Sequence, residues 1–525
     1  MELRLIPVVF LILSPLGLSL EEEVTLTVTS GKPIAETDEN FICATLDWWP
    51  PEKCDFGQCP WGLSSILNLD LKNPILYNAV KAFGSLRIRL GGSLQDQVVY
   101  GVGSRASDCP QFQKTGDGLF GFSEGCLPVD RWDELNEFLN KTGAVVTFGL
   151  NALTGRRKAS PEPRDTLWVG RWDTSNAEDL IAYTLSKGYQ VESWELGNEL
   201  CGSGVAARVD SEQYGHDVVD LRQLLGRLYQ NSTAAPKLLA PGGFFEREWF
   251  AQFLQTSGPG VVDGITHHIY NLGAGNDPSL IDRIQNPSYL SRVSRTYRDV
   301  EVTLNSNGAG GSAWVGESGG AFTSGGRGVS HTFVNGYWYL DQLGMTSTFD
   351  HKVFCRQSLI GGNYGILNTT SFVPNPDYYG ALLWHRLMGT AVLSASHDGS
   401  PFLRAYAHCS KAKPGVTLLL INMSNDTLFD ISVANDGGTS HPLANAQDGS
   451  SNGQKGDREE YHLRPRDGDI HSDVVLLNGT PLTLTSSLEI PDLEPNLVDG
   501  SSPIHLAPQT IAFVLLQGFS ATACF

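Results

Sequence analysis

Short apolar segments alternate with amphipathic helical segments from residue 36 to residue 387. Each apolar segment is followed closely by polar residues, as expected of buried parallel strands that end at a functional edge. Strands are predicted over 85–90, 144–150, 191–196, 238–240, 264–268 and 313–315, and helices over 129–142, 176–186 and 211–229. This order predicts a parallel α/β fold, and the length of the region fits an eight-stranded (β/α)8 TIM barrel.

A second pattern begins at residue 388 and continues to residue 525. Alternating apolar and polar positions at 416–421, 473–477 and 510–516 are separated by turn-rich segments, and helical periodicity disappears. This pattern predicts an all-β domain. Near the N-terminus, Val24, Leu26 and Val28 alternate with threonines. We expect the segment 23–35 to join this β domain, although a place in the barrel is the alternative.

The first twenty residues resemble a targeting segment. Arg4 precedes an apolar run over 5–20, and three glutamates follow at 21–23. A basic start and a short apolar run predict a secretory signal peptide over 1–20. No later run of eighteen apolar residues occurs, so we expect no integral membrane segment in the mature chain.

The composition and the net charge limit the classes of molecule that the protein is expected to bind. The 525 residues carry a formal net charge of −20, which repels polyanions on average, so nucleic acid is not an expected partner. Six N-x-[ST] sequons agree with secretion and predict glycosylation sites. They are Asn140, Asn231, Asn368, Asn422, Asn425 and Asn478.

The nine cysteines indicate disulfides rather than a metal site. An odd number leaves at least one thiol free in an oxidising compartment. Cys54 and Cys59 have no matching Cys/His pair at zinc spacing, so a disulfide or buried thiols are expected there. Adjacent His267 and His268 point to opposite faces of a strand. We therefore predict no metal and no cofactor.

Two glutamates follow predicted strands in similar surroundings. Glu199 ends the segment WELGNE, and Glu317 lies in WVGESGG. Glycoside hydrolysis needs one carboxylic acid that protonates the leaving group and one carboxylate that attacks the anomeric carbon. The order and spacing of the two segments fit strands four and seven of a barrel, so Glu199 and Glu317 are the predicted catalytic pair.

Around these glutamates the chain resembles glycoside hydrolase family 79, in particular its heparanase-like members. The similarity runs through LRIRLGG, FGLNAL, SWELGNE, HHIY, WVGESGGA, CRQSLIGGNYGILN and PNPDYYGALLWHRLMG to AYAHC and a final ACF. It implies a (β/α)8 barrel followed by a β-sandwich, retaining chemistry and glucuronide substrates. It also implies a disulfide between Cys409 and Cys524.

The resemblance assigns roles by position. Glu199 matches the proton donor, Glu317 the nucleophile, and Asn198 the residue that binds the sugar 2-hydroxyl. Asp47 matches an aspartate that binds sugar hydroxyls. Gly362 and Tyr364 match a Gly-Asn-Tyr element whose backbone amides and phenol hold the glucuronate carboxylate.

Three further side chains are expected next to the nucleophile. The resemblance implies that Tyr270, and with it His268, lies beside Glu317 and keeps this carboxylate ionised. Arg89 would act on it electrostatically.

The expected activity is that of a secreted β-glucuronidase, acting on glucuronic acid in proteoglycan glycans or in small glucuronides. The excised linker and the lysine-rich segment of heparanases are missing, and the charge is negative. These departures favour arabinogalactan caps or aryl glucuronides over heparan sulfate. A neutral-sugar β-glycosidase and a non-catalytic glycan-binding matrix protein are the alternatives. The expected location is extracellular or in the cell wall, with vacuole or lysosome as the alternative.

Overall fold

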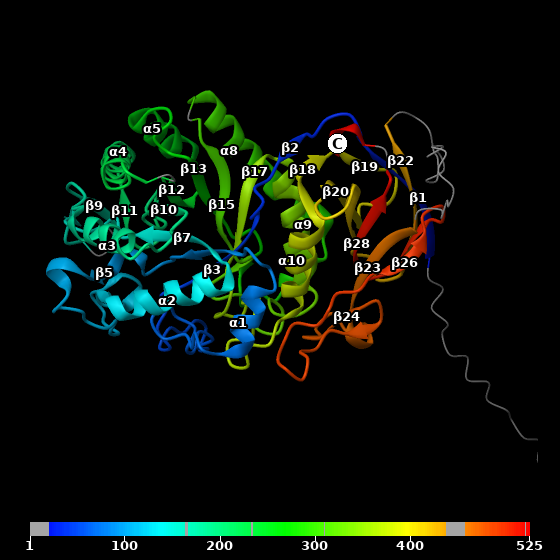
Figure 1. Cartoon of the computed structure of the whole chain (residues 1–525), viewed down its shortest axis with the longest axis horizontal. Coiled ribbons are helices and arrows are strands. Elements are labelled where there is room, and N and C mark those ends of the chain that lie inside the picture. Colours follow the sequence, from blue (N-terminus) through cyan, green and yellow to red (C-terminus); the bar gives the residue numbers. More distant parts are fainter. Residues whose placement is uncertain are drawn as a thin grey trace, which may run out of the picture.

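The computed structural model describes residues 20–162, 166–232, 235–308, 310–436, 457–519 and 521–524. A barrel with surrounding helices forms one part of the molecule and a pair of β-sheets forms the other (Figure 1). The predicted signal peptide, apart from Leu20, lies outside the described residues. Within the described residues, no helix is both long and apolar enough to cross a membrane.

The barrel is closed and entirely parallel. Its eight strands are β3 (Ile42–Leu46), β4 (Arg87–Leu90), β7 (Val145–Leu150), β10 (Ser193–Leu196), β12 (Lys237–Phe244), β13 (Gly264–Ile269), β15 (Ser312–Ser318) and β17 (His351–Arg356). Neighbours in the barrel follow chain order, and β17 closes onto β3. The (β/α)8 barrel is therefore confirmed, with β10 and β15 as strands four and seven.

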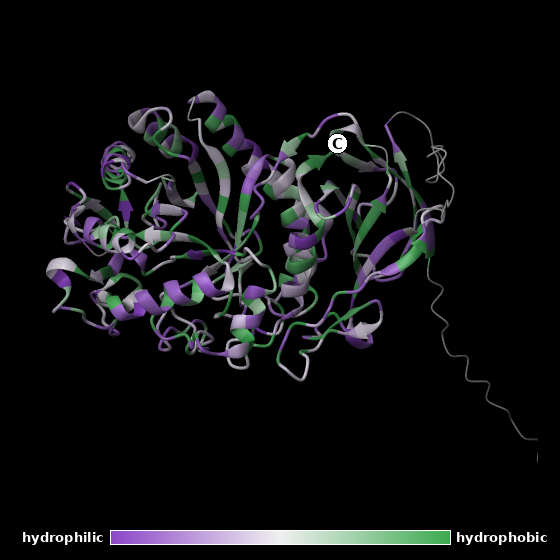
Figure 2. Ribbon diagram, viewed as in Figure 1, coloured by the Kyte–Doolittle hydropathy of each residue, from purple (hydrophilic) through white to green (hydrophobic). Residues whose placement is uncertain are grey.

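Helices cover the outside of the barrel. They are α1 (Pro74–Lys81), α2 (Val129–Thr142), α3 (Ser175–Ser186), α4 (Ser211–Leu228), α5 (Arg247–Ser257), α6 (Leu280–Ile284), α7 (Pro287–Leu290), α8 (Ser294–Ser306), α9 (Asn335–Thr348) and α10 (Pro376–Leu387). Helix α2 shows why such segments are helical: Trp132, Leu135 and Leu139 share one buried face, and Gly143 ends the helix in the left-handed conformation. Hydrophilic and hydrophobic residues alternate along these helices (Figure 2).

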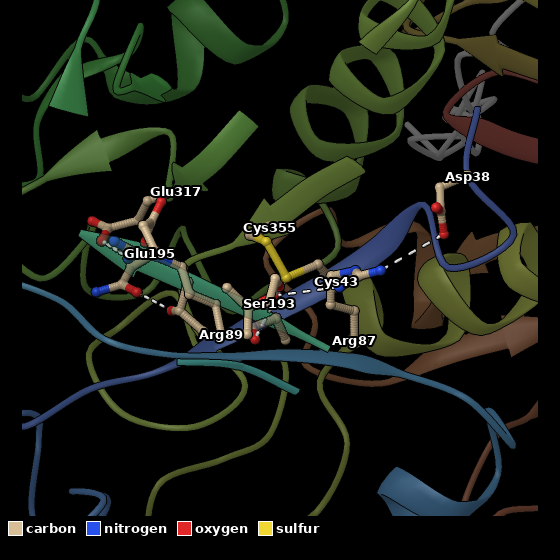
Figure 3. The surroundings of a disulfide bond; sticks show 12 residues. Asp38, Cys43, Arg87, Arg89, Ser193, Glu195, Glu317 and Cys355 are labelled. Atoms are coloured by element: carbon tan, nitrogen blue, oxygen red, sulfur yellow. Dashed lines mark hydrogen bonds and ion pairs between the residues drawn. A yellow bond between two sulfur atoms is a disulfide. The ribbon is translucent and has the colours of Figure 1, made fainter. Parts of the chain in front are cut away.

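Strands β3 and β17 were not predicted from the apolar pattern. Every residue of β3 is buried, although Thr45 is polar, and β17 begins with His-Lys and ends with Arg356. Polar residues inside a small barrel interrupt the continuous apolar run that buried parallel strands usually show. Cys43 and Cys355, which are paired in register, join the two strands through a disulfide (Figure 3).

Helices α9 and α10 lie between the barrel and the sheets (Figure 1). Helix α9 is buried along nearly its whole length because it packs against both parts. Its Asp341 accepts hydrogen bonds at 2.6 Å from both Arg404 and Tyr406 of β20 (Leu403–Ser410). A buried ion pair with full hydrogen bonding therefore connects the barrel to the sheets.

Two sheets form the sandwich, and their facing apolar side chains make a separate core. One sheet has the order β19-β1-β22-β27, from β1 (Leu20–Val28), β19 (Ala395–His397), β22 (Thr427–Asn435) and β27 (Ile504–Leu506). The other contains β2 (Ala35–Glu36), β18 (Met388–Leu393), β20, β21 (Gly415–Asn422), β23 (Asp457–Pro465), β24 (Val475–Leu477), β25 (Thr480–Pro481), β26 (Asn496–Asp499) and β28 (Thr510–Gln517). Strand β1 pairs with β22 and β19, and thus with the sandwich rather than the barrel.

Short sheets also form within the loops of the barrel. They pair β5 (Val98–Gly101) with β6 (Gly125–Pro128), β8 (Arg157–Lys158) with β9 (Leu167–Val169) and β11 (Arg208–Val209), and β14 (Gly273–Ala274) with β16 (Ala321–Phe322). The last of these pairs brings the segment after β15 against the segment after β13.

Eight of the nine cysteines are paired. Cys409 and Cys524 form the disulfide that the resemblance implied. Cys54–Cys59 and Cys109–Cys126 close short loops. Cys201, which follows Glu199 closely, is the free and buried thiol.

Two of the six glycosylation predictions need correction. The Asn422 side chain is fully buried, and its Nδ2 donates to the carbonyls of Thr427, Leu506 and Ala507. Nδ2 of Asn478 donates to two further carbonyls. A glycan on either nitrogen would displace these bonds, so both predictions are withdrawn. The four exposed asparagines, which remain predictions, are Asn140, Asn231, Asn368 and Asn425.

Candidate active site

The two predicted catalytic glutamates meet at the carboxyl end of the barrel. Glu199 follows β10 by three residues, and Glu317 is the penultimate residue of β15. Carboxylate oxygens of the two side chains lie within 4.8 Å of each other. Both residues are at most 8% exposed. Carboxyl groups about 5–5.5 Å apart are typical of retaining glycosidases, whereas inverting enzymes need a wider gap for water.

The backbone at Glu199 is held against β12. Glu199 has a positive φ of 56°, and its N–H donates to the carbonyl of Gly242 at 2.7 Å. A Cβ at Gly243 would lie 3.0 Å from Cα of Glu199 and 2.6 Å from the Cys201 sulfur. Glycine at 243 therefore allows the Glu199 loop to approach β12 this closely.

The surroundings of Glu199 favour its protonated form. Burial raises the pKa of Glu199 to about 7. His268 Nδ1 lies 3.0 Å from Oε1 of Glu199. Burial also lowers the pKa of His268 to about 4, so this imidazole is neutral near pH 7. His268 lies beside the nucleophile as predicted, because it is the partner of Glu317 in the pairing of β13 with β15 and ligand atoms of the two side chains lie within 4.8 Å. Its hydrogen bond, however, joins it to the other glutamate, Glu199.

Glu317 receives donors on both oxygens. The phenol of Tyr270 donates to Oε1 at 2.6 Å, and Arg89 Nη1 donates to Oε2 at 2.9 Å. Burial and the neighbouring carboxylate keep the pKa of Tyr270 well above its ordinary value, so the phenol keeps its proton. The two donors fix both oxygens of this carboxylate in place. Tyr270 and Arg89 therefore occupy the positions predicted for them.

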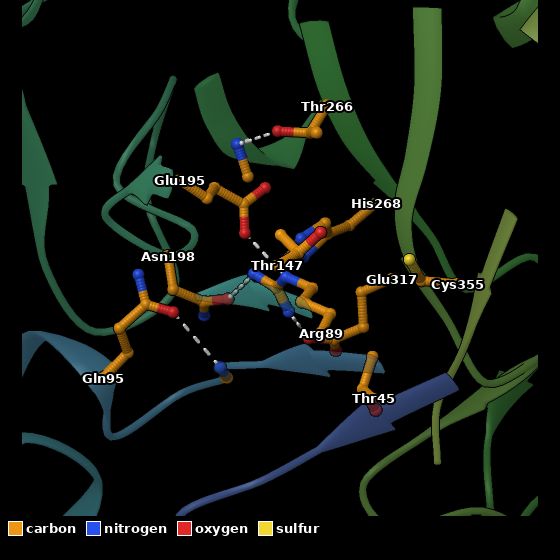
Figure 4. Close-up of polar contacts among 12 residues, drawn as sticks. Thr45, Arg89, Gln95, Thr147, Glu195, Asn198, Thr266, His268, Glu317 and Cys355 are labelled. Carbon is orange, nitrogen blue, oxygen red and sulfur yellow. Dashed lines mark hydrogen bonds and ion pairs between the residues drawn. The ribbon is translucent and has the colours of Figure 1, made fainter. Parts of the chain in front are cut away.

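Arg89 connects three groups of the site (Figure 4). In addition to Glu317, its Nε donates to Oε2 of Glu195 at 2.6 Å and its Nη2 to Oδ1 of Asn198 at 2.9 Å. Its guanidinium is buried and charged between two carboxylates. Because Oδ1 of Asn198 accepts from Arg89, Nδ2 is left as the free donor, and this buried atom has no protein partner.

Asp96 fixes the backbone next to the acid. Its Oδ2 accepts from the N–H of Asn198 at 2.8 Å, and its Oδ1 accepts from the N–H of Ala152 at 2.7 Å. This residue was not predicted, since it lies in an irregular segment after β4 rather than in a recognisable motif. Its two hydrogen bonds hold the loop after β7 and the loop after β10 next to each other.

A second group of residues comes from the ends of β3 and β17. Asp47 is buried, and its Oδ2 accepts from Nε2 of Gln357 at 3.0 Å. Burial and the nearby Glu317 raise the pKa of Asp47 to about 7. Gln357 was missed, although it follows Arg356 at the end of β17 as Asn198 follows β10. Figure 3 shows Glu317 and Arg89 together with the disulfide between Cys43 of β3 and Cys355 of β17.

Tyr364 lines the same cavity, whereas the backbone beside it is only partly available. Gly362 has a φ of 70°, and a Cβ there would lie 2.6 Å from the Tyr364 ring. The N–H of Asn363 already donates to the carbonyl of Ser324 at 2.7 Å. This amide is not free for a ligand, and the roles of Gly362 and Tyr364 stay predictions. Arg356, paired with Asp377, donates to the Tyr364 carbonyl at 2.9 Å and holds the segment.

The active-site cavity has a volume of about 530 Å³. Its floor carries both glutamates, and its rim is largely aromatic. It is lined by Trp49, Lys53, Asp55, Ser93, Phe120, Glu199, Val205, Phe244, Tyr270, Glu317, Phe322, Thr323, Ser324, Gln357 and Tyr364. One sugar ring and part of a leaving group fit this volume.

Glu199, His268 and Glu317 are also the one cluster of potential metal ligands found among the described residues. Glu317 accepts from Arg89 and Tyr270, and the Arg89 cation opposes a second cation at this point. The arrangement therefore fits acid/base and nucleophilic roles better than metal ligation.

Comparison with known proteins agrees with this geometry. Residues 23–344 match the profile described as Glycosyl hydrolase family 79, N-terminal domain. The chain is 52% identical over 523 residues to Heparanase-like protein 2 of Arabidopsis thaliana, with 96% of this chain and 95% of that protein aligned. It is 43% identical over 508 residues to baicalin-β-D-glucuronidase of Scutellaria baicalensis, with 95% and 93% aligned.

Among solved structures, a 4-O-α-L-rhamnosyl-β-D-glucuronidase from Fusarium oxysporum shares the fold. The TM-score is 0.64 at 15% identity, over 94% of this chain and 100% of that one.

Proposed function

Because the chain belongs to glycoside hydrolase family 79, we propose that it hydrolyses β-glucuronosidic bonds with retention of configuration. Glu317 is the nucleophile and Glu199 the general acid and base. The observation that carries this proposal is the pair of carboxyl groups within 4.8 Å of each other, set in opposite environments. Glu199 is buried with a raised pKa, and Glu317 accepts two strong donors.

In the first step, an oxygen of Glu317 attacks the anomeric carbon while the bond from this carbon to the leaving oxygen breaks. Glu199 gives its proton to the leaving oxygen. Its pKa of about 7 keeps it protonated up to about neutral pH, and a general acid works best when its pKa is close to the working pH. The free Nδ2 of Asn198 is suited to bind the sugar 2-hydroxyl as positive charge develops on the ring.

In the second step, Glu199 accepts a proton from water, and the water oxygen attacks the anomeric carbon. The ester bond to Glu317 breaks and the carboxylate is restored. While Glu317 is esterified, Arg89 has lost one of its two counter-charges. Since the charge of Arg89 lowers the pKa of Glu199, this loss favours the ionised Glu199 that the second step needs as a base.

Recognition of the glucuronate carboxylate falls to Tyr364, with Asp47 and Gln357 available for hydroxyl groups. Tyr364 is 4% exposed, and burial keeps the pKa of its phenol well above the ordinary value. A protonated phenol in a closed site donates to a carboxylate, and a neutral sugar leaves that donor without a partner. The names of the relatives, a glucuronidase among them, agree with an acid sugar.

The predicted signal peptide and the four disulfides support action in an oxidising compartment outside the cytoplasm. The substrate is accordingly a small glucuronide or a glucuronic-acid-bearing glycan. Expression with a C-terminal tag and assay of the medium would test secretion, and retention of the protein in the cytosol would contradict it.

Hydrolysis of 4-nitrophenyl β-D-glucuronide and of the matching β-D-glucoside, followed by proton NMR, tests the activity. We expect the glucuronide to be cleaved at least about 100-fold faster, since unpaired polar groups strongly discriminate between substrates. The β-anomer of glucuronic acid should form first. Preference for the glucoside would identify a neutral-sugar glycosidase. Binding of the glucuronide without turnover would identify a glycan-binding protein.

A further inference from the structure

We propose that the leaving-group side of the active-site cavity is built to hold a flat, apolar, aromatic aglycone. The inference rests on the proposed β-glucuronidase function and adds the chemical class of the group that departs. It selects an aryl or arylmethyl glucuronide over a sugar or a sulfated polymer as the preferred substrate.

The sugar-binding side and the leaving-group side of the cavity are formed by residues from different barrel strands. Asp47, Gln357 and Tyr364 come from the ends of β3 and β17, on one side of the nucleophile. Glu199 comes from β10, and the neighbouring strand β12 ends at Phe244 on the other side. Because Glu199 protonates the departing oxygen, the leaving group lies over β10 and β12.

Exposed apolar side chains surround this position. Phe244 is 42% exposed, Phe322 45% and Val205 48%, and all three line the cavity. Large apolar side chains left in water beside a catalytic site indicate a binding surface.

The rim is tied to the catalytic groups by direct contacts. The N–H of Val205 donates to the carbonyl of Glu199 at 3.3 Å. The Phe244 ring centroid lies 6.2 Å from the rings of both His268 and Tyr270, which contact the two glutamates. An aromatic group bonded to the departing oxygen would therefore meet Phe244 as soon as the sugar is in place.

The charges around the cavity disfavour an anionic leaving group. Lys53 is the one cation among its lining residues, and its ammonium pairs with Asp55 at 2.9 Å and lies 4.5 Å above the Trp49 ring. On the leaving-group side, the Glu246 carboxylate lies against Gly202. Among the residues that line the cavity, a sulfate or a second uronate would find no unpaired cation, and the net charge of −20 repels it further.

Hydroxyl groups of a sugar aglycone also find few partners on this side. The loops after β10 and β12 contribute only Val205 and Phe244 to the lining besides the acid Glu199. The other polar lining residues lie in or after β15 and in the segments that follow β3, β4, β13 and β17. A polar group buried without a partner weakens binding, whereas an aromatic ring has no such requirement.

The test compares glucuronides whose leaving groups are all primary or simple alcohols, so that intrinsic reactivity is similar. The four substrates are 2-naphthylmethyl β-glucuronide, methyl β-glucuronide, β-glucuronosyl-(1→6)-galactose, and a β-glucuronoside of N-sulfated glucosamine. We expect kcat/KM for the naphthylmethyl compound to exceed that for the galactose compound by about 10-fold or more, chiefly through KM. The sulfated compound should be the poorest.

Single substitutions test whether Phe244 is the source of the preference for the aromatic aglycone. Phe244→Ala should lower the ratio of kcat/KM for the naphthylmethyl compound over the methyl compound by about 10-fold. Phe402→Ala is the matched control, because this phenylalanine is 41% exposed and lies outside the cavity. It should leave the ratio and both activities unchanged. An unchanged ratio in the Phe244 variant, or faster turnover of the galactose or sulfated compound, would overturn the inference.

A binding measurement separates this inference from the proposed function. Calorimetry with the methyl and 2-naphthylmethyl 1-thio-β-glucuronides, which resist hydrolysis, should show about 10-fold tighter binding of the aromatic compound. Equal affinities would overturn the aglycone assignment even if every glucuronide is cleaved. Tighter aromatic binding without hydrolysis of any glucuronide would uphold it and contradict the catalytic proposal alone.

Discussion

His268 Nδ1 lies 3.0 Å from Oε1 of Glu199, and both side chains are buried. Burial acts on the two groups in opposite directions, raising the pKa of the carboxyl to about 7 and lowering that of the imidazole to about 4. Below about pH 7 the carboxyl therefore holds its proton beside an uncharged imidazole, and the pair has no net charge. The carboxyl proton is the one that the leaving group needs.

The first prediction concerns the alkaline side of the pH profile. The pKa of Glu199 is raised, so the acid is protonated below about pH 7 and loses its proton as the pH rises through that value. We expect kcat/KM for an alkyl glucuronide to fall about tenfold per pH unit above this point. A profile measured from pH 4 to pH 9 with methyl β-glucuronide checks it.

Asp47 provides the control for this assignment, because its pKa is also raised to about 7. In Glu199→Gln, measured with a dinitrophenyl glucuronide that needs no proton, the alkaline decline should disappear. If the decline persists in this variant, it originates in Asp47 or in Asp96, whose pKa is also raised to about 7, and Glu199 is not the titrating acid.

The second prediction separates the two glutamates by their dependence on the leaving group. Glu317→Gln removes the nucleophile and should lower kcat by at least about 10⁴-fold on every substrate. Glu199→Gln should lower kcat by about 10²- to 10⁴-fold on alkyl glucuronides. It should change the dinitrophenyl glucuronide by less than about 10-fold, since that oxygen departs without help. Equal losses on both kinds of substrate would contradict the division of roles.

The third prediction concerns selection of the acid sugar by Tyr364. One hydrogen bond from a phenol to a charged carboxylate in a closed site is worth about 1.5–3 kcal/mol. Tyr364→Phe should therefore lower kcat/KM for a glucuronide by roughly 10- to 150-fold. Residual activity on the matching glucoside should hardly change. Tyr77→Phe on α1, outside the cavity, is the control, and equal losses on both sugars would make Tyr364 a packing residue.

The fourth prediction concerns the stability of the sandwich. Cys409 and Cys524 are 115 residues apart, so in the chain-entropy model their disulfide stabilises the fold by about 5 kcal/mol. Replacing both by serine should lower the free energy of unfolding by about this amount in guanidinium titrations. The pair Cys54 and Cys59 closes a separation of only 5 residues, and its removal should cost about 2 kcal/mol. Equal losses from the two pairs would contradict the loop-length explanation.

Sequence patterns predicted the parts of the fold in which local features, such as an apolar helix face or a terminal glycine, determine the structure. Helix α2 matches its predicted bounds because an apolar face and a terminal glycine act together. Strands β3 and β17 were missed because Thr45 in β3 and the polar ends of β17, His351 and Arg356, interrupt the apolar run. Helix α9 is buried against two domains at once, a tertiary fact with no signature in local periodicity.

In the candidate site, too, the sequence predicted residues that lie in local motifs and missed contacts that depend on tertiary packing. Glu199, Glu317, Asn198 and Tyr270 were predicted because they follow strands within recognisable motifs. The hydrogen bond between His268 and Glu199 was not predicted, since the resemblance places the ring beside Glu317 but does not give which of the two nearby carboxyl groups it meets. Asn422 was taken for a glycosylation site because a sequon carries no information on burial.

Labelling of the nucleophile tests the central claim most directly. A 2-deoxy-2-fluoro-β-D-glucuronosyl fluoride should react with the enzyme once and leave a covalent glycosyl ester that is slow to hydrolyse. Mass spectrometry of the digested protein should find the sugar on the peptide that contains Glu317, with Glu199 unmodified. A label on Glu199, or turnover of the natural linkage with inversion and no covalent adduct, would contradict the account.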